Sequence, residues 1–388
     1  MSWLDHANRL KQLPPYLFVE LDWAKRTLQA AGKDVIDLGV GDPDLPPPPP
    51  VIERLKAAAE DPRRHRYSST EGLRELREAI ATWYQRRFQV SLDPSTEILP
   101  LLGSKEGIAH LPLALTDPGD VVLVPDPGYP PYGGGAILAG AEVSPMPLRE
   151  ANGFFPDLDA ISQPVAQRAK LMYLNYPNNP TAAVASTEQF QRAIAWARAS
   201  QVLIAHDAAY SEVAFDGFKP ISLLQLPGAR SVGIEFHSLS KTYNMSGWRI
   251  GWVCGNAALI RALTQLKTYL DSGIFQPLQW AAIEALERGQ DTLRQTVRTY
   301  QERRDLLVRG LTAAGWPVPT PQAGLYLWAR VPTQASSVAF ATRVLNDAQV
   351  VVTPGVGFGA AGEGYVRLSL TVPTPRLEEA IVRLRKIL

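Results

Sequence analysis

The chain has 388 residues, of which 46% are hydrophobic and 20% are charged, with 39 lysines and arginines against 38 aspartates and glutamates. This composition excludes intrinsic disorder as the main state, and the net charge of +1 excludes a general attraction to nucleic acid or to an anionic membrane. The single cysteine, Cys254, excludes a disulfide framework and a cysteine-based zinc site within the chain.

A chain of this length is expected to form two domains. Its first ten residues include Asp5, His6 and Arg9 and contain no apolar stretch of the kind found in signal peptides. No apolar run is long enough to span a membrane. We therefore expect a cytoplasmic protein without a membrane partner.

Five consecutive prolines occupy residues 46–50. Proline lacks an N–H group and cannot lie in a helix interior, so this run is expected to be a stiff, extended connector. A ligand for an SH3-type domain is the weaker alternative, because ordered segments flank the run closely on both sides.

Helical and strand-like patterns alternate from about residue 50 onward. Apolar residues recur at helical spacing over residues 73–88, and Ser186 with Gln189 has the spacing of a capping box at the start of another helix. Several of the apolar runs between the helices suit strands that are covered on both faces, and their alternation with helices predicts a mainly parallel α/β sheet. The expected strands lie at residues 97–102, 121–124, 141–146, 171–174, 202–205, 231–236 and 250–254.

The last third of the chain has a different pattern. A helical segment covers about residues 279–314 with a bend near Gly289, and strand-like segments follow at 324–331 and 364–370. With helices expected near residues 335–347 and 375–387, this part predicts a smaller α+β domain. The expected division is an N-terminal arm at 1–45 that packs with the small domain, a large domain at 46–285 and the small domain at 286–388.

Small, polar or aromatic residues follow five of the expected strands. Because ligands of open α/β sheets bind beyond the carboxyl ends of the strands, these residues predict one polar pocket that suits an anion. They are Gly103, Ser104 and Lys105; Tyr129; residues 175–181; His206, Asp207 and Tyr210; and residues 237–241.

Several of these residues have both a structural and a functional interpretation. Gly103 and Ser104 form a turn and a helix cap, which is the better interpretation in isolation, or a phosphate site at a helix N-terminus. Asp207 follows a buried strand, so its carboxylate needs donors or a cation from the protein or from a cofactor. Lys241 is a solvated lysine unless the pocket desolvates it, in which case its pKa falls and it becomes a nucleophile able to form a Schiff base.

Two arginines are candidate anion ligands. Arg249 forms an ordinary salt bridge or, together with Ser238, binds a phosphate dianion. Arg367 is flanked by apolar residues in an expected strand, where an arginine needs a partner, and a substrate carboxylate is a suitable one.

Two kinds of site are not supported by the sequence. Residues 357–362 match GxGxxG literally, but they lead into a strand rather than into a helix, so a dinucleotide site is not expected there. The histidines lack metal-ligand spacing and are better interpreted as core or surface residues, so no metal is expected. They are His6, His65, His110, His206 and His237.

The chain resembles the class I/II aminotransferases, which are pyridoxal-phosphate enzymes of fold type I, over nearly its whole length. The most specific motif covers residues 238–251 and reads SLSKTYNMSGWRIG. The others lie at residues 41–44, 127–130, 178–181 and 207–210, with Tyr67 and Arg367. The resemblance implies a large domain with a mostly parallel seven-stranded sheet, a smaller α+β domain and a homodimer with active sites at the subunit interface.

The resemblance also implies how the ring of pyridoxal 5′-phosphate is held. Lys241 binds the cofactor as a Schiff base and, once displaced by the substrate, moves the proton between the substrate Cα and the cofactor. Asp207 pairs with the pyridinium nitrogen and makes the ring an electron sink. Tyr210 and Asn179 hydrogen-bond the phenolic oxygen, and Tyr129 stacks on the ring face.

Phosphate and substrate contacts follow from the same resemblance. The phosphate is bound by four residues and by Tyr67 of the neighbouring subunit. The α-carboxylate of the substrate is bound by Arg367, together with Asn179 and the backbone N–H of Gly41. The four phosphate-binding residues are Ser104, Lys105 through its backbone N–H, Ser238 and Arg249.

One position departs from the family pattern. The usual Asn-Pro-Thr-Gly ends in Ala182 here. If that position needs a positive φ, an alanine is strained there. We expect Asn179 to keep its role and the loop to differ.

Within the class, four stretches resemble the LL-diaminopimelate aminotransferases: residues 13–18, 37–44, 65–72 and 103–108. Those enzymes exchange an amino group between LL-2,6-diaminopimelate and 2-oxoglutarate in lysine biosynthesis. Glu71, from the partner subunit, is the residue expected to meet the distal ammonium group of such a substrate.

Alternatives stay open on the same residues. The enzyme could use aspartate, alanine or aromatic amino acids, or it could be a pyridoxal-phosphate lyase or a cyclopropane-forming synthase that shares Lys241 and Asp207. A cofactor-binding regulator or interaction protein ranks lowest. Regulators built on this fold carry an additional DNA-binding domain, and the net charge of +1 does not indicate one here.

Overall fold

Seven strands form the main sheet of the computed structural model, which describes residues 5–14 and 17–388. They are β2 (Ile98–Leu101), β3 (Val121–Asp126), β4 (Glu142–Pro147), β5 (Ala169–Asn175), β6 (Leu203–Asp207), β7 (Gly233–Ser238) and β8 (Gly251–Gly255). Their order is β2-β8-β7-β6-β5-β3-β4, with β8 antiparallel to both neighbours and the other pairs parallel. The seven expected strands and the mainly parallel sheet are therefore confirmed.

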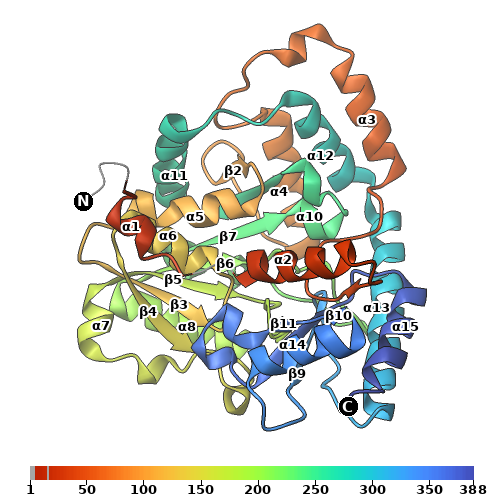
Figure 1. Ribbon diagram of the computed structural model, residues 1–388. Coiled ribbons are helices and arrows are strands. Elements are labelled where there is room, and N and C mark those ends of the chain that lie inside the picture. The colour runs from red at the N-terminus through yellow and green to blue at the C-terminus, as the bar shows by residue number, and fades with distance from the viewer. Residues whose placement is uncertain (1–4, 15–16) are drawn as a thin grey trace.

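Helices pack on both faces of this sheet (Figure 1). Apolar residues of α5, α6 and α11 share one core with the sheet, and those of α8 and α9 share another. The helices of this part are α3 (Pro49–Ala59), α4 (Arg74–Phe88), α5 (Ser104–Leu115), α6 (Pro131–Ala139), α7 (Gln163–Arg168), α8 (Thr187–Ser200), α9 (Ala229–Val232), α10 (Leu239–Thr242), α11 (Ala257–Leu270) and α12 (Gln276–Arg288).

Local sequence rules account for several helix starts. Ser186 caps α8, accepting the Gln189 N–H at 3.2 Å, while the Gln189 side chain accepts the Ser186 N–H at 2.9 Å, so the capping box is confirmed. The proline run departs from the expected connector at its end, because Pro49 and Pro50 begin α3. Proline is well tolerated there, since the N–H groups of the first helical turn have no partner within the helix.

The C-terminal part contains a second, smaller sheet. β9 (Tyr326–Arg330), β12 (Tyr365–Ser369) and β11 (Thr353–Pro354) are antiparallel. Three helices pack with them: α13 (Gln290–Ala313), α14 (Ser337–Ala348) and α15 (Thr374–Leu384). Gly289 separates α12 from α13, which confirms the expected break, and α13 runs along one side of the molecule to the C-terminal elements (Figure 1).

The N-terminal segment is tied to the C-terminal elements. After α1 (Asn8–Lys11) and α2 (Leu17–Ala30), β1 (Ile36–Asp37) pairs in parallel with β10 (Val350–Val351). The Leu38 carbonyl accepts the Ser369 N–H at 2.7 Å, the Gly39 carbonyl accepts the Thr353 hydroxyl at 2.9 Å, and the Val40 carbonyl accepts the Thr371 hydroxyl at 3.0 Å. Residues 36–40 are thereby held by the C-terminal part, whereas the expected domain boundaries stay a prediction.

Two exclusions made from the sequence can be compared with the structure. Residues 357–362 form short turns, η6 (Gly355–Phe358) and η7 (Ala360–Gly362), that lead into β12, so the GxGxxG match lacks the helix that a dinucleotide site needs. Among the described residues, no helix combines the length and apolar character needed to cross a membrane.

Candidate active site

A cavity of about 640 Å³ lies at the carboxyl edge of the main sheet, where the smaller sheet approaches it. The loops that follow β2, β5, β6 and β7 contribute to its wall. Arg249, two residues before antiparallel β8, contributes as well. Eleven residues expected at the site line it: Gly41, Ser104, Lys105, Tyr129, Asn179, Asp207, Tyr210, Ser238, Lys241, Arg249 and Arg367. The expected single pocket is therefore present.

Asp207 ends β6 as a buried carboxylate, with 5% of its surface exposed. It accepts hydrogen bonds from the Tyr132 hydroxyl at 2.8 Å and from the Ala209 N–H at 3.2 Å. Burial raises the pKa of Asp207. Among the described residues none forms an ion pair with it, so a cationic group of a ligand would complete its surroundings.

Lys241 follows β7 on the short helix α10, whose first residues are capped by the Ser238 hydroxyl. Its Nζ donates to the Gly41 carbonyl at 2.8 Å across the cavity. Burial lowers the pKa of Lys241. The structure thus places this lysine in the desolvated setting in which an amine becomes nucleophilic.

An anion cradle forms where α5 begins. Arg249 donates to the Ser246 carbonyl at 2.8 Å and lies against Gly103, where a Cβ atom would come within 2.2 Å of the guanidinium. Gly103 also has a φ of +78°, which favours glycine. The Ser104 and Ser238 side chains and the N-terminus of α5 line the same part of the cavity, and this combination suits a phosphate.

Arg367 lies in β12 and reaches the cavity from the small sheet. It donates to the Asn179 side-chain oxygen at 2.7 Å and to the Gly39 carbonyl at 2.6 Å. Its guanidinium stacks on the rings of Tyr326 and Phe358, at 4.1 and 4.6 Å from their centroids. A buried arginine fixed in this way is suited to bind a carboxylate with two hydrogen bonds.

Tyr132 and Tyr326 were not expected at the site from the sequence, and Asn175 was expected only within the run 175–181, without a role of its own. Tyr132 donates to Asp207, and the Asn175 side chain donates to the Asp207 carbonyl at 2.8 Å. The Tyr326 hydroxyl is 3.0 Å from that of Tyr210. Tyr326 also explains why residue 41 is a glycine, because a Cβ atom at this position would come within 2.0 Å of the Tyr326 hydroxyl.

Tyr67 and Glu71 lie away from this cavity, and so do some members of the runs expected there, His206 and His237 among them. The Tyr67 side chain is 94% exposed, and Glu71 is exposed, with one carboxylate oxygen 3.8 Å from Arg77. Neither lines the wall of the pocket. Because both were expected to act on the neighbouring subunit, their roles stay predictions.

Ala182 has a φ of +57°, the left-handed conformation in which an alanine is strained. Its N–H still donates to the Asn178 carbonyl at 2.9 Å, and the Asn178 N–H donates to the Ala183 carbonyl at the same distance. The turn therefore closes despite the alanine, and Asn179 faces Arg367 as described above.

Lys267 anchors the start of α5 from outside the cavity. This lysine is 1% exposed and donates to Glu106 at 2.9 Å and to Asp271 at 2.5 Å, while the other Glu106 oxygen accepts the Leu102 N–H at 2.5 Å. Glu106, Asp271 and His110 also stand close enough together to bind a metal ion, but the ammonium group already bonds both carboxylates. The network therefore fixes the residue that precedes Gly103.

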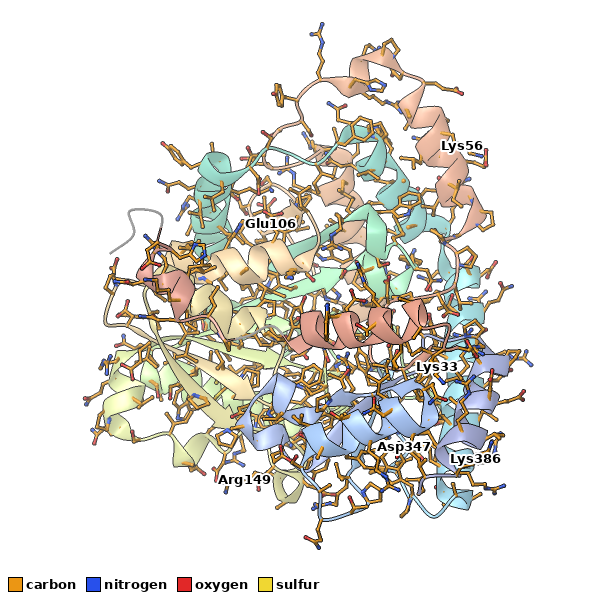
Figure 2. The ribbon with its side chains drawn as sticks, viewed as in Figure 1. Lys33, Lys56, Glu106, Arg149, Asp347 and Lys386 are labelled. Atoms are coloured by element: carbon orange, nitrogen blue, oxygen red, sulfur yellow. The ribbon has the colours of Figure 1, made fainter. Side chains whose placement is uncertain are left out.

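Replacing Lys267 with methionine is expected to lower the free energy of unfolding by about 3 kcal/mol, because Glu106 and Asp271 would be left without their cation. The measurement is urea-induced unfolding followed by tryptophan fluorescence. Lys56→Met is the control, since the Lys56–Glu53 pair on α3 is exposed (Figure 2) and should contribute under 1 kcal/mol. Equal losses in the two variants would contradict the anchoring role.

This chain is similar to known proteins both in sequence and in structure. A family model described as aminotransferase class I and II matches residues 33–384. A protein named LL-diaminopimelate aminotransferase from Desulforudis audaxviator (strain MP104C) is 55% identical over 385 residues, which cover 99% of this chain and 98% of that protein. A protein of the same name from Aquifex aeolicus (strain VF5) is 50% identical over 383 residues, 99% of each chain.

Solved structures agree with the fold. Substrate-bound BacF from Bacillus subtilis superposes with a TM-score of 0.95 at 37% identity, covering 99% of this chain and 98% of the other. Aspartate aminotransferase from Thermus thermophilus with maleate gives a TM-score of 0.92 at 29% identity, covering 99% of this chain and 100% of the other.

Proposed function

This chain belongs to the class I and II aminotransferases, and from that premise we propose that it transfers the amino group of LL-2,6-diaminopimelate to 2-oxoglutarate with pyridoxal 5′-phosphate as cofactor. The observation that carries the proposal is the cavity that brings Lys241, Asp207 and Arg367 together. Such a reaction serves lysine biosynthesis, and the cytoplasmic location expected from the sequence stays a prediction.

The residues of the cavity fit this cofactor. Asp207 is a buried carboxylate without a cationic partner among the described residues, which suits a protonated pyridine nitrogen. The cradle of Gly103, Ser104, Ser238 and Arg249 suits a phosphate, and the space there exists only because residue 103 has no Cβ. When bound, the cofactor supplies an electron sink for negative charge that develops at the substrate Cα.

The protein's own groups have distinct tasks in this proposal. Lys241 carries the cofactor and then moves a proton at its Nζ, and its lowered pKa favours the neutral amine that this task needs. Arg367 binds the α-carboxylate, assisted by Asn179 and the Gly41 N–H, and so orients the substrate Cα toward Lys241. Tyr210, backed by Tyr326, donates a hydrogen bond to the oxygen of the cofactor ring.

The remaining contacts hold the cofactor in place. Tyr129 stacks on its ring, Ser104 and Ser238 bind its phosphate with the Lys105 backbone N–H, and Tyr67 comes from the partner subunit. The support for these roles is the position of the first four residues on the cavity wall.

The substrate proposal rests on the relatives' names. Proteins named LL-diaminopimelate aminotransferase are 48–55% identical to this chain over nearly its full length, and the sequence motif 65–72 lies in the loop that carries Tyr67 and Glu71. Part of the motif at 13–18 falls outside the described residues. The alternatives are aspartate, alanine or an aromatic amino acid as donor.

The test is a half-reaction screen by absorbance. The holoenzyme is mixed with one amino acid at a time, without a keto acid, and conversion of the pyridoxal form of the cofactor to the pyridoxamine form is recorded. Conversion by LL-diaminopimelate and glutamate, but not by lysine, aspartate, alanine or phenylalanine, is the expected result. If diaminopimelate is inert, the substrate proposal is wrong, and pyruvate release without an acceptor would indicate a lyase.

Glu71→Gln is expected to lower kcat/KM for LL-diaminopimelate about tenfold while leaving glutamate unchanged, because only the former has a distal ammonium group to pair with the carboxylate. The measurement is steady-state kinetics with each donor. Glu75→Gln is the matched control, since Glu75 is an exposed carboxylate four residues along the same surface. Equal losses with both donors would remove Glu71 from substrate recognition.

A homodimer completes the proposal. Aromatic and aliphatic side chains are exposed next to the Tyr67 loop: Tyr67, Tyr269, Leu270 and Phe275. Their segments lie together, because the ring of Phe275 contacts that of His65 and Gln279 bonds the Ser68 hydroxyl. A second copy of the chain covering this surface would bring Tyr67 to its neighbour's cavity. Light scattering should then give twice the 42.5 kDa of one chain, and that of a single chain would contradict the proposal.

A further inference from the structure

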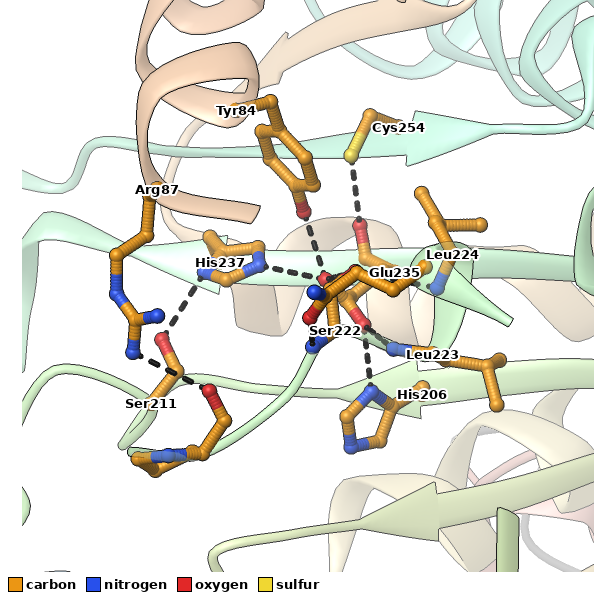
Figure 3. Close-up of polar contacts among 12 residues, drawn as sticks. Tyr84, Arg87, His206, Ser211, Ser222, Leu223, Leu224, Glu235, His237 and Cys254 are labelled. Atoms are coloured by element: carbon orange, nitrogen blue, oxygen red, sulfur yellow. Dashed lines mark hydrogen bonds and ion pairs between the residues drawn. The ribbon is translucent and has the colours of Figure 1, made fainter. Parts of the chain in front are cut away.

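A second polar cluster is buried in the main sheet and takes no part in the site described above (Figure 3). At its centre Glu235 of β7 lies beside His206 of β6, its register partner, and both side chains are completely buried. A buried carboxylate persists only where donors and a counter-charge compensate its lost hydration. The identity of that counter-charge can be deduced from the hydrogen bonds.

Glu235 is surrounded by donors. One oxygen accepts the Tyr84 hydroxyl at 2.9 Å and the Ser222 hydroxyl at 2.7 Å, and the other accepts the Leu223 N–H at 2.7 Å. Both oxygens accept hydrogen bonds, so neither is free to carry a proton, and the ionised carboxylate satisfies all of these donors. Burial alone would raise the pKa of Glu235, but the hydrogen bonds from His206 and His237 hold it below its usual range.

The two histidines differ in what their second ring nitrogen meets. His206 has Nδ1 2.8 Å from Glu235 and Nε2 3.1 Å from the Tyr176 carbonyl. Both partners are acceptors, so both nitrogens of His206 must carry a proton. His237 has Nε2 3.0 Å from Glu235, but its Nδ1 faces the Ser211 hydroxyl at 3.5 Å, which can donate, so a neutral ring satisfies His237.

His206 precedes Asp207 in β6, and side chains of consecutive strand residues point to opposite faces of a sheet. The imidazolium therefore lies on the face away from the cavity, directly behind the carboxylate that lacks a cation. Burial raises the pKa of Asp207, whereas the hydrogen bonds from Tyr132 and from the Ala209 N–H, and a positive His206 or His237, lower it. Because His206 and Asp207 are both buried in the sheet, a charge on His206 acts on Asp207 through a low dielectric.

From this geometry we propose that His206 is a positioning residue: it carries a proton on both ring nitrogens, Glu235 holds it in that state, and its positive charge keeps Asp207 ionised for the pyridine nitrogen of the cofactor. The role toward Asp207 rests on the proposed function, but the protonation of His206 does not. Loss of the pair would let Asp207 take up a proton at a higher pH than in the wild type.

On the face of β6 away from the cavity, no other described group replaces His206 as the cation. The neighbouring tyrosines and the thiol have pKa values raised by burial, and so they are neutral at physiological pH: Tyr84 of α4, Tyr132 of α6, Tyr173 of β5, Tyr210 after β6 and Cys254 of β8. On the cavity side of Asp207 the cations are Lys105, Lys241, Arg249 and Arg367, and beyond Ser211 the Arg87–Glu212 pair is balanced. His206 is thus the cation on the buried face.

The protonation is tested by NMR of the full chain with ¹⁵N-labelled histidine, before and after pyridoxal 5′-phosphate is added. His206 is expected to give two N–H proton signals at neutral pH in both samples, and both should vanish in His206→Gln. Glu235→Gln should leave one of them. A single N–H signal from His206 in the wild type would overturn the proposal, whatever the protein's activity.

The effect on Asp207 is tested by measuring the affinity for pyridoxal 5′-phosphate across pH. In His206→Gln, the affinity for the cofactor should begin to fall at a pH about one unit higher than in the wild type. On the acid side of that point, the variant should bind the cofactor about tenfold more weakly than the wild type at the same pH. Tyr84→Phe is the matched control, because it removes a neutral donor from the same carboxylate and should leave the midpoint unchanged. Coincident midpoints in His206→Gln and wild type would refute the link to Asp207, whereas no binding by the wild type would refute the proposed function and leave the NMR result standing.

Discussion

Replacing Lys241 with arginine is expected to slow amino transfer by about 10⁴-fold or more, because the loss combines nucleophilic attachment of the cofactor with proton transfer at one atom. Arginine keeps the positive charge but does not lose its proton at any pH the enzyme meets. The lowered pKa of Lys241, by contrast, favours the neutral amine. The measurement is a single-turnover half-reaction with the preferred amino donor.

The control for this variant is Lys56→Arg, an exposed lysine on the outer face of α3 (Figure 2). It should transfer amino groups at the wild-type rate. The Lys241→Arg protein should still bind the cofactor without a covalent bond, since the phosphate cradle and Asp207 are unchanged. If Lys241→Arg retained more than about a hundredth of the wild-type rate, the amine could not be the group that moves the proton.

Replacing Arg367 with lysine should lower kcat/KM for every amino donor by about a hundredfold or more, mainly through KM. Lysine keeps a charge but lacks the planar fork that binds a carboxylate with two hydrogen bonds. It also leaves Asn179 and the Gly39 carbonyl without the donors they have now. Steady-state kinetics with two donors of different side chain is the appropriate measurement.

Arg330→Lys provides the comparison, because Arg330 lies on the neighbouring strand β9 but is exposed, where it pairs with Glu150. The kcat/KM of the Arg330→Lys variant should change less than twofold. An Arg367→Lys effect confined to one donor would mean that Arg367 recognises the distal end of that substrate rather than the α-carboxylate common to all of them.

The sequence was sufficient for the main sheet because several of its strands are nearly all apolar and are bounded by turn residues. It did not predict β1, β10 or β11, which have two residues each. A strand that short carries no periodicity, and β1 and β10 pair with each other across more than 300 residues of chain. Of the second sheet, the sequence therefore predicted β9 and β12 but not β11.

The candidate site was predictable where residues directly follow strands and belong to a motif, as Asp207 and Lys241 do. Tyr326 was missed because the alternation of β9 indicates a core strand, and nothing local shows that its hydroxyl faces Tyr210. Tyr132 and Asn175 support Asp207 from other elements, a relation that only the fold creates. The roles expected of Tyr67 and Glu71 depend on a second chain, which no pattern within one chain can position.

The pairing of β1 with β10 sets the order in which the molecule can be completed during synthesis. Ile36 leaves the ribosome 314 residues before its partner Val350, which is roughly 15–60 s at ordinary translation rates. The segment around Gly41 forms one wall of the cavity. It can be held in place only after Ser369 and Thr371 have been synthesised, which is later still. A nascent chain can therefore assemble its large sheet early, yet it gains a closed active site only when its last strand has emerged.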